Sequence, residues 1–170
     1  MLSRLPERIE PLAMAEAGRE FSGSLDLAGL ARLAPLLASR QGALTVSLLL
    51  DRDEAGTRYL AGRVAGQLQL ECQRCLGAME FALDSDFRLG LVRSEEEAAR
   101  LPPGYEPLLV GTDPMSLADI VEDEVLLALP IVALHREPHP CAAQQHQEPP
   151  PEGEQRENPF AVLAQLKRDK

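Results

Sequence analysis

The stretch Met79-Glu80-Phe81-Ala82-Leu83-Asp84-Ser85-Asp86-Phe87-Arg88-Leu89-Gly90-Leu91-Val92 alternates between apolar and charged or small side chains, with Ser85 as the interruption of the apolar row. Period-two alternation is typical of an antiparallel strand that buries one face and exposes the other to solvent. Residues 44–50 and 60–72 alternate in the same way. Three consecutive strands are therefore expected, with residues 72–77 as the turn between the second and the third.

Helical signals flank these strands. Leucines recur at helical spacing over residues 24–38, and Ser116 is placed to cap a second helix over residues 117–129, before Pro130. A capping box at residues 94–97 predicts a short helix, and residues 105–110 predict an edge strand. The expected fold class is α+β: an antiparallel, meander-like sheet from residues 43–92, covered by the 24–38 and 117–129 helices.

The composition changes after that region. Residues 1–135 read as one domain, whereas residues 136–157 are rich in Pro, Gln and Glu and predict a flexible linker. Residues 158–170 then form a C-terminal docking segment, whose expected short helix has Asn158 as cap and Phe160 and Leu163 on its apolar side. Because so short a helix is unstable alone in water, it is expected to dock on its own sheet or on a partner.

Charge and composition limit the functions to consider. The net charge of −10 argues against autonomous binding to a phosphate backbone and fits either a basic protein partner or solubility alone. No apolar run has the length of a membrane span, and no secretory signal opens the chain. An odd count of three cysteines favours a reducing cytoplasm.

Cys72 and Cys75 form a CxxC pair at the predicted strand turn, and Cys141 lies near His135 and His139. Three thiolates and one imidazole, with His139 as the candidate, would suit one structural zinc ion and leave no open position for catalysis. The alternative, which the sequence alone favours, is a tight turn with no cofactor and a spare cysteine in the tail. Redox chemistry is disfavoured because a strand, rather than a helix, follows the pair.

The 117–129 helix is acidic. Asp119, Glu122 and Asp123 are expected on its solvent face, as a candidate surface for a basic partner or simply a solvated face. Glu124 points to the opposite side, toward the sheet, where an unpaired carboxylate is costly. We therefore expect an arginine partner for Glu124, with Arg74 as the candidate, and Arg74 also as a candidate partner-binding residue.

Four ordered motifs carry a resemblance to a known family: Glu71-Cys72-Gln73-Arg74-Cys75, residues 101–107, residues 121–130 and Asn158-Pro159-Phe160-Ala161-Val162-Leu163. They resemble the bacterial large ribosomal RNA subunit accumulation protein YceD family. The resemblance implies a non-enzymatic, cytoplasmic ribosome biogenesis factor that supports accumulation of large-subunit rRNA. Its expected partner is a basic large-subunit ribosomal protein or an assembling ribosomal particle, with contact to rRNA only indirect.

Two other classes of function stay open. A small zinc- or thiol-dependent enzyme would centre on Cys72, Cys75 and a histidine, although no common hydrolase, nucleotide-binding or metalloprotease motif occurs. A direct rRNA-binding protein would need one basic patch assembled from the strand arginines, which are Arg58, Arg63, Arg74, Arg88 and Arg93.

Overall fold

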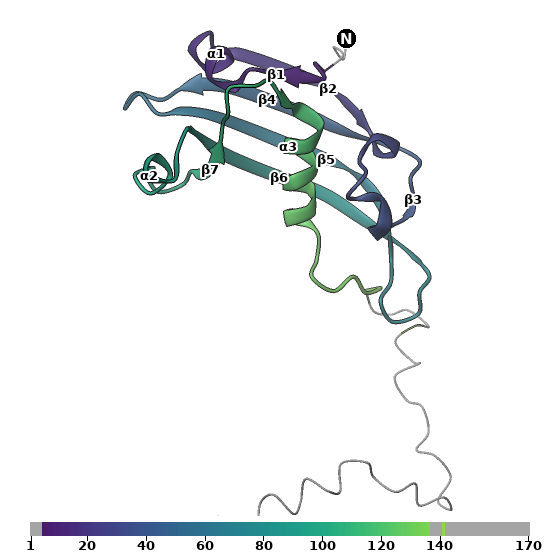
Figure 1. Ribbon diagram of the computed structural model, residues 1–170. Helices are drawn as coiled ribbons and strands as arrows, with labels where there is room; N and C mark the ends of the chain where they lie inside the picture. The colour runs from purple at the N-terminus through teal and green to yellow at the C-terminus, as the bar shows by residue number, and fades with distance from the viewer. Residues whose placement is uncertain (1–4, 137–140, 142–170) are drawn as a thin grey trace, which may run out of the picture. The chain divides into compact units, whose positions relative to one another are not determined.

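The computed structural model describes residues 5–136 and Cys141 (Figure 1). The chain divides into two compact units, residues 1–136 and residues 137–170. The fold below is that of the first unit. Most of the predicted linker, and the whole docking segment at residues 158–170 with Asn158, Phe160 and Leu163, lie outside the described residues.

One large sheet dominates the first unit. Its strands run in the order β2-β4-β5-β6-β7, and β3 pairs with the far half of β5. The bounds are β2 Arg19–Asp26, β3 Leu37–Ser39, β4 Ala43–Arg52, β5 Arg58–Glu71, β6 Ala78–Val92 and β7 Glu106–Leu109. The three predicted strands are confirmed as β4, β5 and β6. All pairs are antiparallel except β6 and β7, so the α+β class is confirmed while the sheet itself is mixed.

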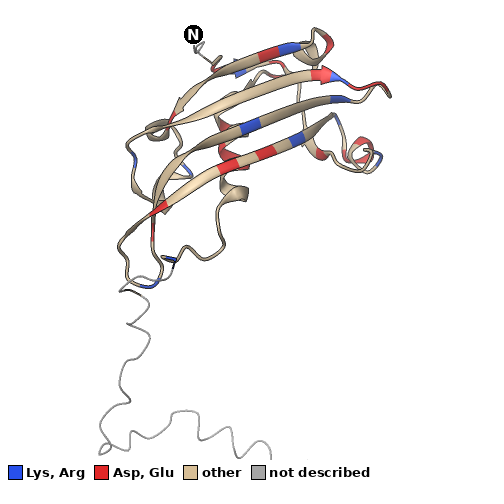
Figure 2. Ribbon diagram, turned by 180° about the vertical axis from the view of Figure 1, so that it is seen from behind, with Lys and Arg blue, Asp and Glu red and all other residues tan. Residues whose placement is uncertain are grey.

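One face of this sheet carries the core. The buried leucines and valines of β4, β5 and β6 point to the side covered by α1, Pro11–Glu16, and α3, Leu117–Ala128 (Figure 1). Gly62 faces Phe87 across the β5–β6 pair, and a Cβ at position 62 would lie 2.2 Å from the Phe87 ring. A glycine is needed there because the aromatic ring fills the space that a side chain would take. The opposite face has no covering helix among the described residues (Figure 2).

The predicted helix over residues 24–38 is wrong. The chain continues β2 to Asp26 and then makes two short 3-10 turns, Leu27–Gly29 and Ala34–Leu36, before β3. Leu27, Leu30 and Leu33 are all buried, so their spacing did mark a packed segment. Pro35 lacks the N–H that a continuous helix requires, and Gly29 weakens helix further.

Smaller elements follow the sequence closely. Ser94 caps α2, Glu95–Ala98: its Oγ accepts a hydrogen bond from the Glu97 N–H at 3.3 Å, and Glu97 Oε2 accepts from the Arg93 N–H at 2.8 Å. Ser116 caps α3 by accepting from the Asp119 N–H at 3.2 Å.

The remaining strands complete the unit. β7 lies at the sheet edge as predicted, and two short strands, β1 at Arg8–Ile9 and β8 at Met115–Ser116, pair antiparallel in a separate two-stranded sheet. None of the helices in the described part of the chain has the length and apolar character to cross a bilayer.

Candidate functional site

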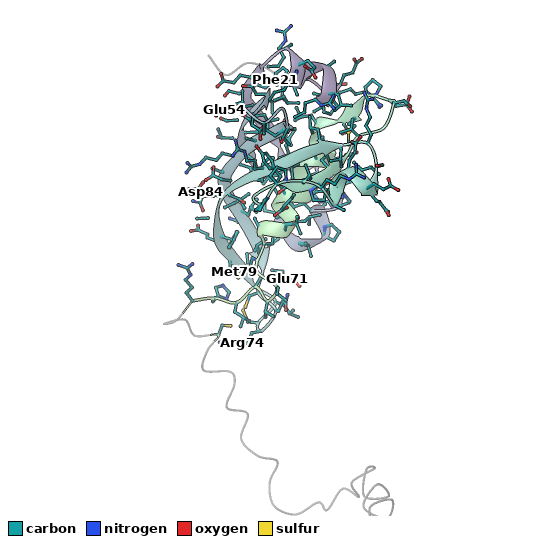
Figure 3. The ribbon with its side chains drawn as sticks, turned by 90° about the vertical axis from the view of Figure 1, so that its left-hand side faces the viewer. Phe21, Glu54, Glu71, Arg74, Met79 and Asp84 are labelled. Atoms are coloured by element: carbon teal, nitrogen blue, oxygen red, sulfur yellow. The ribbon has the colours of Figure 1, made fainter. Side chains whose placement is uncertain are left out.

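A rigid turn joins β5 to β6 at the end of the sheet where Figure 3 labels Glu71, Arg74 and Met79. The Cys72 N–H donates to the Gly77 carbonyl at 2.9 Å, and the Leu76 N–H donates to the Cys72 carbonyl at 2.8 Å. Leu76 adopts a left-handed backbone with φ of 58°, which is uncommon for a residue with a branched side chain. These bonds hold both thiols at one end of the hairpin, with Cys72 buried and Cys75 half-buried.

A distant segment meets this turn. The Gln73 N–H donates to the Ala133 carbonyl at 2.9 Å, which brings His135 alongside. The ligand atoms of Cys72, Cys75 and His135 lie within 4.8 Å of one another. His135 Nε2 lies 3.1 Å from the Ala78 carbonyl oxygen, which can only accept, so this nitrogen carries the proton. Nδ1 then presents its lone pair toward Cys75 Sγ at 3.6 Å, and metal-binding histidines likewise donate the other ring N–H to an acceptor.

The other predicted ligands have different outcomes. His139 lies outside the described residues, and the imidazole that the first unit places beside the thiols is His135. Cys141 belongs to the second unit. The sequence places both histidines near Cys141, and the ligand set predicted from it used His139. What distinguishes them is the backbone bond at Ala133, which leaves no mark in the residue pattern.

Arg74 does not pair with Glu124, so that prediction is wrong. Arg74 lies in the β5–β6 turn, and its Nη1 atom is buried with no hydrogen-bond partner among the described residues. Glu124 is inward-facing as predicted, at 8% exposure, yet no hydrogen bond or ion pair reaches it within the described residues. The two groups lie on different parts of the fold, because Arg74 occupies the hairpin tip and Glu124 the middle of α3.

A second carboxylate of α3 is fully paired. Glu122 Oε1 accepts from the backbone N–H groups of Arg32 and Leu33 at 2.7 and 2.8 Å, and Oε2 accepts from Arg32 Nε at 3.1 Å. The expectation that Glu122 lies on the solvent face is wrong, because the segment around Arg32 covers that side and leaves Glu122 3% exposed.

The other two acidic residues of that predicted face stay exposed. Asp123 forms an ion pair with Arg32, and the backbone carbonyl of Asp119 accepts from Arg32 Nη2 at 2.9 Å. The hydrogen bonds that the Arg32 guanidinium donates, first to Asp123 and then to Glu122, raise its pKa, so it stays charged. The acidic face of α3 is therefore partly neutralised by its own chain.

Glu124 lines an open groove of about 920 Å³ beside β6. The groove is lined from β6, from Tyr105, from Glu106 at the start of β7, and from Leu127 and Ala128 of α3. Desolvation first, and then the charges of Glu106 and Asp123, raise the pKa of Glu124. A carboxylate with that environment gains strongly from a cation placed beside it.

The groove has an open strand at its rim. β7 pairs only with Leu89–Val92 of β6, so the backbone of residues 80–88 has no strand partner on that side among the described residues. Figure 1 shows β6 continuing as the border of the sheet past the end of β7, toward the turn that joins it to β5. An unpaired strand edge is a template for an added strand.

The strand arginines do not form a continuous basic patch. Arg63 makes a bidentate pair with Asp84 at 2.9 and 2.7 Å, and Arg58 approaches Glu16 at 3.6 Å. Arg88 stacks over the rings of Tyr59 and Tyr105, 4.6 and 5.0 Å from their centroids. Figure 2 shows basic and acidic residues interspersed over the open face. The face has mixed charge, which is a poor footprint for a phosphate backbone.

Comparison with known proteins points to one family. The family model described as "Large ribosomal RNA subunit accumulation protein YceD" matches residues 60–167. A curated protein of the same description from Haemophilus influenzae is 32% identical over 169 residues, which is 97% of this chain and 97% of that protein. No solved structure matches the chain. The matched span includes the CxxC turn, the open strand edge, the groove and His135.

Proposed function

The chain belongs to the YceD family of large ribosomal RNA subunit accumulation proteins, and on that premise we propose that it supports large-subunit biogenesis by binding a basic component. The partner is a basic ribosomal protein of the large subunit or an assembling particle that displays one. Contact with rRNA is indirect, and the action is binding rather than bond-making chemistry.

The observation that carries this proposal is the balance of paired and unpaired charge. The net charge is −10, and the two arginines of the open sheet face are already held, Arg63 by Asp84 and Arg88 by aromatic rings. The carboxylates around α3 include one, Glu124, that has no cation among the described residues. Such a surface speeds encounter with positively charged partners and disfavours nucleic acid.

Affinity purification tests the proposal directly. The tagged full-length chain is expected to recover large-subunit ribosomal proteins, and a chain lacking residues 158–170 recovers less of them if the apolar C-terminal segment adds affinity. RNase treatment separates the alternatives, since recovery through a protein partner survives it. Recovery of no large-subunit component by either chain contradicts the proposal. Recovery that RNase abolishes, together with steep salt dependence, points to a direct rRNA-binding protein.

We also propose that the turn between β5 and β6 holds one structural zinc ion through Cys72, Cys75, His135 and Cys141. The donor set supports this: two thiols and an imidazole with a protonated Nε2 already converge in the first unit. Cys141 follows His135 by only six residues and would supply a third thiolate. Four protein ligands complete a tetrahedral site, so the ion would brace the fold and would not activate water.

Elemental analysis of the untagged protein measures the metal. About one equivalent of zinc is expected, and less than about a tenth of an equivalent contradicts the site. Cys75→Ser and His135→Ala should lose the metal, whereas His139→Ala is the matched control that should keep it. If His135→Ala keeps the zinc and His139→Ala loses it, the histidine ligand is His139. Cobalt substitution, read by thiolate charge-transfer absorption, reports the ligand set without reference to activity.

A further inference from the structure

We propose that the groove beside Glu124 and the open edge of β6 form one binding site for an extended, basic peptide segment of a partner protein. The peptide adds a strand along residues 80–88 of β6, in line with β7, and places a Lys or Arg side chain against Glu124. This inference rests on the proposed function and gives it a location.

The free edge of β6 at residues 80–88 has the geometry to accept an added strand. A strand that pairs with β6 in this stretch meets free backbone N–H and C=O groups, because β5 occupies only the other side of β6. Side chains of an added strand alternate between the two faces of the sheet. Those that fall on the face of Ser85 and Phe87 enter the groove, which these two residues line together with Glu124. Main-chain pairing gives affinity, and the side-chain pocket gives selectivity.

The groove beside this edge is lined by several carboxylates. Glu124 is more than nine-tenths buried, lines the groove and has no partner among the described residues. Glu106 and Asp86 line the same groove and add negative charge. Arg88 is the lining cation in the described part of the chain, and its guanidinium is already stacked on Tyr59 and Tyr105. A Lys or Arg side chain of the partner can therefore pair with these carboxylates without displacing a cation of the described residues.

The apolar walls of the groove determine which peptide side chains fit. Phe87, Leu127 and Ala128 supply apolar walls, so the methylene stem of a Lys or Arg side chain packs while its charged end reaches the carboxylate. A peptide of alternating basic and aliphatic residues satisfies the groove and the strand edge together. An acidic or proline-rich peptide satisfies neither, because the first is repelled and the second cannot donate backbone hydrogen bonds.

The probe is a fluorescein-labelled synthetic peptide that alternates Lys and Val, with its binding to the full chain followed by fluorescence anisotropy. A peptide alternating Lys and Pro has the same charge and is the control for strand pairing. Glu106→Gln/Glu124→Gln should weaken the Lys–Val peptide by at least roughly tenfold, since a charged partner is lost in a desolvated site. Glu54→Gln/Glu95→Gln, which removes two exposed carboxylates that do not line the groove, should have less than about a twofold effect.

Several results overturn the inference. Equal weakening by the two double variants means that net charge, and not the groove, attracts the peptide. Equal binding of the Lys–Pro peptide rules out strand addition, as does an absence of amide chemical-shift changes at residues 80–88 on peptide binding. No binding of the Lys–Val peptide to the unsubstituted chain also rejects the site. Far-UV circular dichroism of each variant verifies that it folds.

The same variants separate this inference from the proposed function. If the tagged unsubstituted chain and its Glu106→Gln/Glu124→Gln variant recover large-subunit proteins equally, the groove is not the site and the proposed function stands. If the unsubstituted chain recovers none, the proposed function itself fails.

Discussion

Two buried carboxylates on α3 differ in how many hydrogen bonds offset the cost of removing their charge from water. Glu122 is 3% exposed and accepts three hydrogen bonds, two from backbone N–H groups and one from the Arg32 side chain. Glu124 is 8% exposed and, within the described residues, accepts none. The first carboxylate ties a distant segment to α3. The second carries a desolvation cost that no hydrogen bond or ion pair among the described residues offsets.

The difference separates a structural role from a binding role. A buried charge with a full set of donors stabilises the fold and offers nothing to a ligand. A buried charge that lacks donors lowers stability, and that cost is recovered when a partner brings a cation. Position on the acidic helix therefore says little by itself about partner binding. The number of donors that reach each oxygen decides it.

The largest expected effect comes from removing the satisfied carboxylate. Glu122→Ala leaves the Arg32 and Leu33 N–H groups without their acceptor and is expected to lower the free energy of unfolding by roughly 2–4 kcal/mol. Urea denaturation measures the change. Asp123→Ala is the matched control, because that exposed carboxylate loses only a surface ion pair worth about 1 kcal/mol or less. Equal losses for the two variants would contradict the structural role of Glu122.

A smaller loss is expected for Arg32→Gln. The substitution removes the guanidinium from Glu122 and Asp123 but leaves both backbone hydrogen bonds to Glu122 in place. Because the Arg32 side chain is 48% exposed, water and salt already weaken its ion pairs. Arg32→Gln should therefore destabilise less than Glu122→Ala, and its effect should shrink as salt is added in urea denaturation. A loss as large as that of Glu122→Ala would assign the stabilisation to the ion pair instead of to the backbone bonds.

The strands and the caps were predictable because their signals are local. Alternation over residues 79–92 requires one buried face whatever surrounds the sheet, and β6 follows it closely. Ser94 and Ser116 act on backbone groups within three residues, so no distant information is needed. The segment at 24–38 failed because its leucines are spaced as in a helix while the packing that buries them comes from irregular turns.

The site residues were harder to place because their partners lie far along the chain. A helical wheel puts Glu122 opposite the sheet, and only the segment at Arg32, ninety positions away, turns that side into an interior. The same holds for His135, whose approach to the CxxC turn depends on the Gln73–Ala133 backbone bond. Sequence reasoning identified Glu124 as an inward carboxylate but supplied the wrong partner. Burial follows from the helix period, whereas pairing depends on tertiary geometry.

The smallest expected effect, and the one of opposite sign, belongs to Glu124→Gln. The pKa of Glu124 is raised by desolvation and by the charges of Glu106 and Asp123, so the folded chain holds a proton there more tightly than the unfolded chain does. That contribution to stability is fully present below the unfolded pKa and is lost as the pH rises through the folded pKa. The neutral glutamine avoids the loss. Glu124→Gln should therefore be modestly more stable than the unsubstituted chain at pH 7, and this advantage should shrink on acidification.

Urea denaturation of both chains between about pH 4 and pH 8 measures this difference, with the window set by the unfolded Glu pKa of about 4.3. Glu54→Gln is the control, since it removes an exposed carboxylate that does not line the groove. A Glu124→Gln advantage that stays constant over this range would mean that packing, rather than charge, produces it. An unsubstituted chain more stable than Glu124→Gln at pH 7 would show that Glu124 already has a cation in the isolated chain. Either result would mean that Glu124, like Glu122, carries no uncompensated charge, and it would contradict the proposal that Glu124 binds a cationic side chain of a partner.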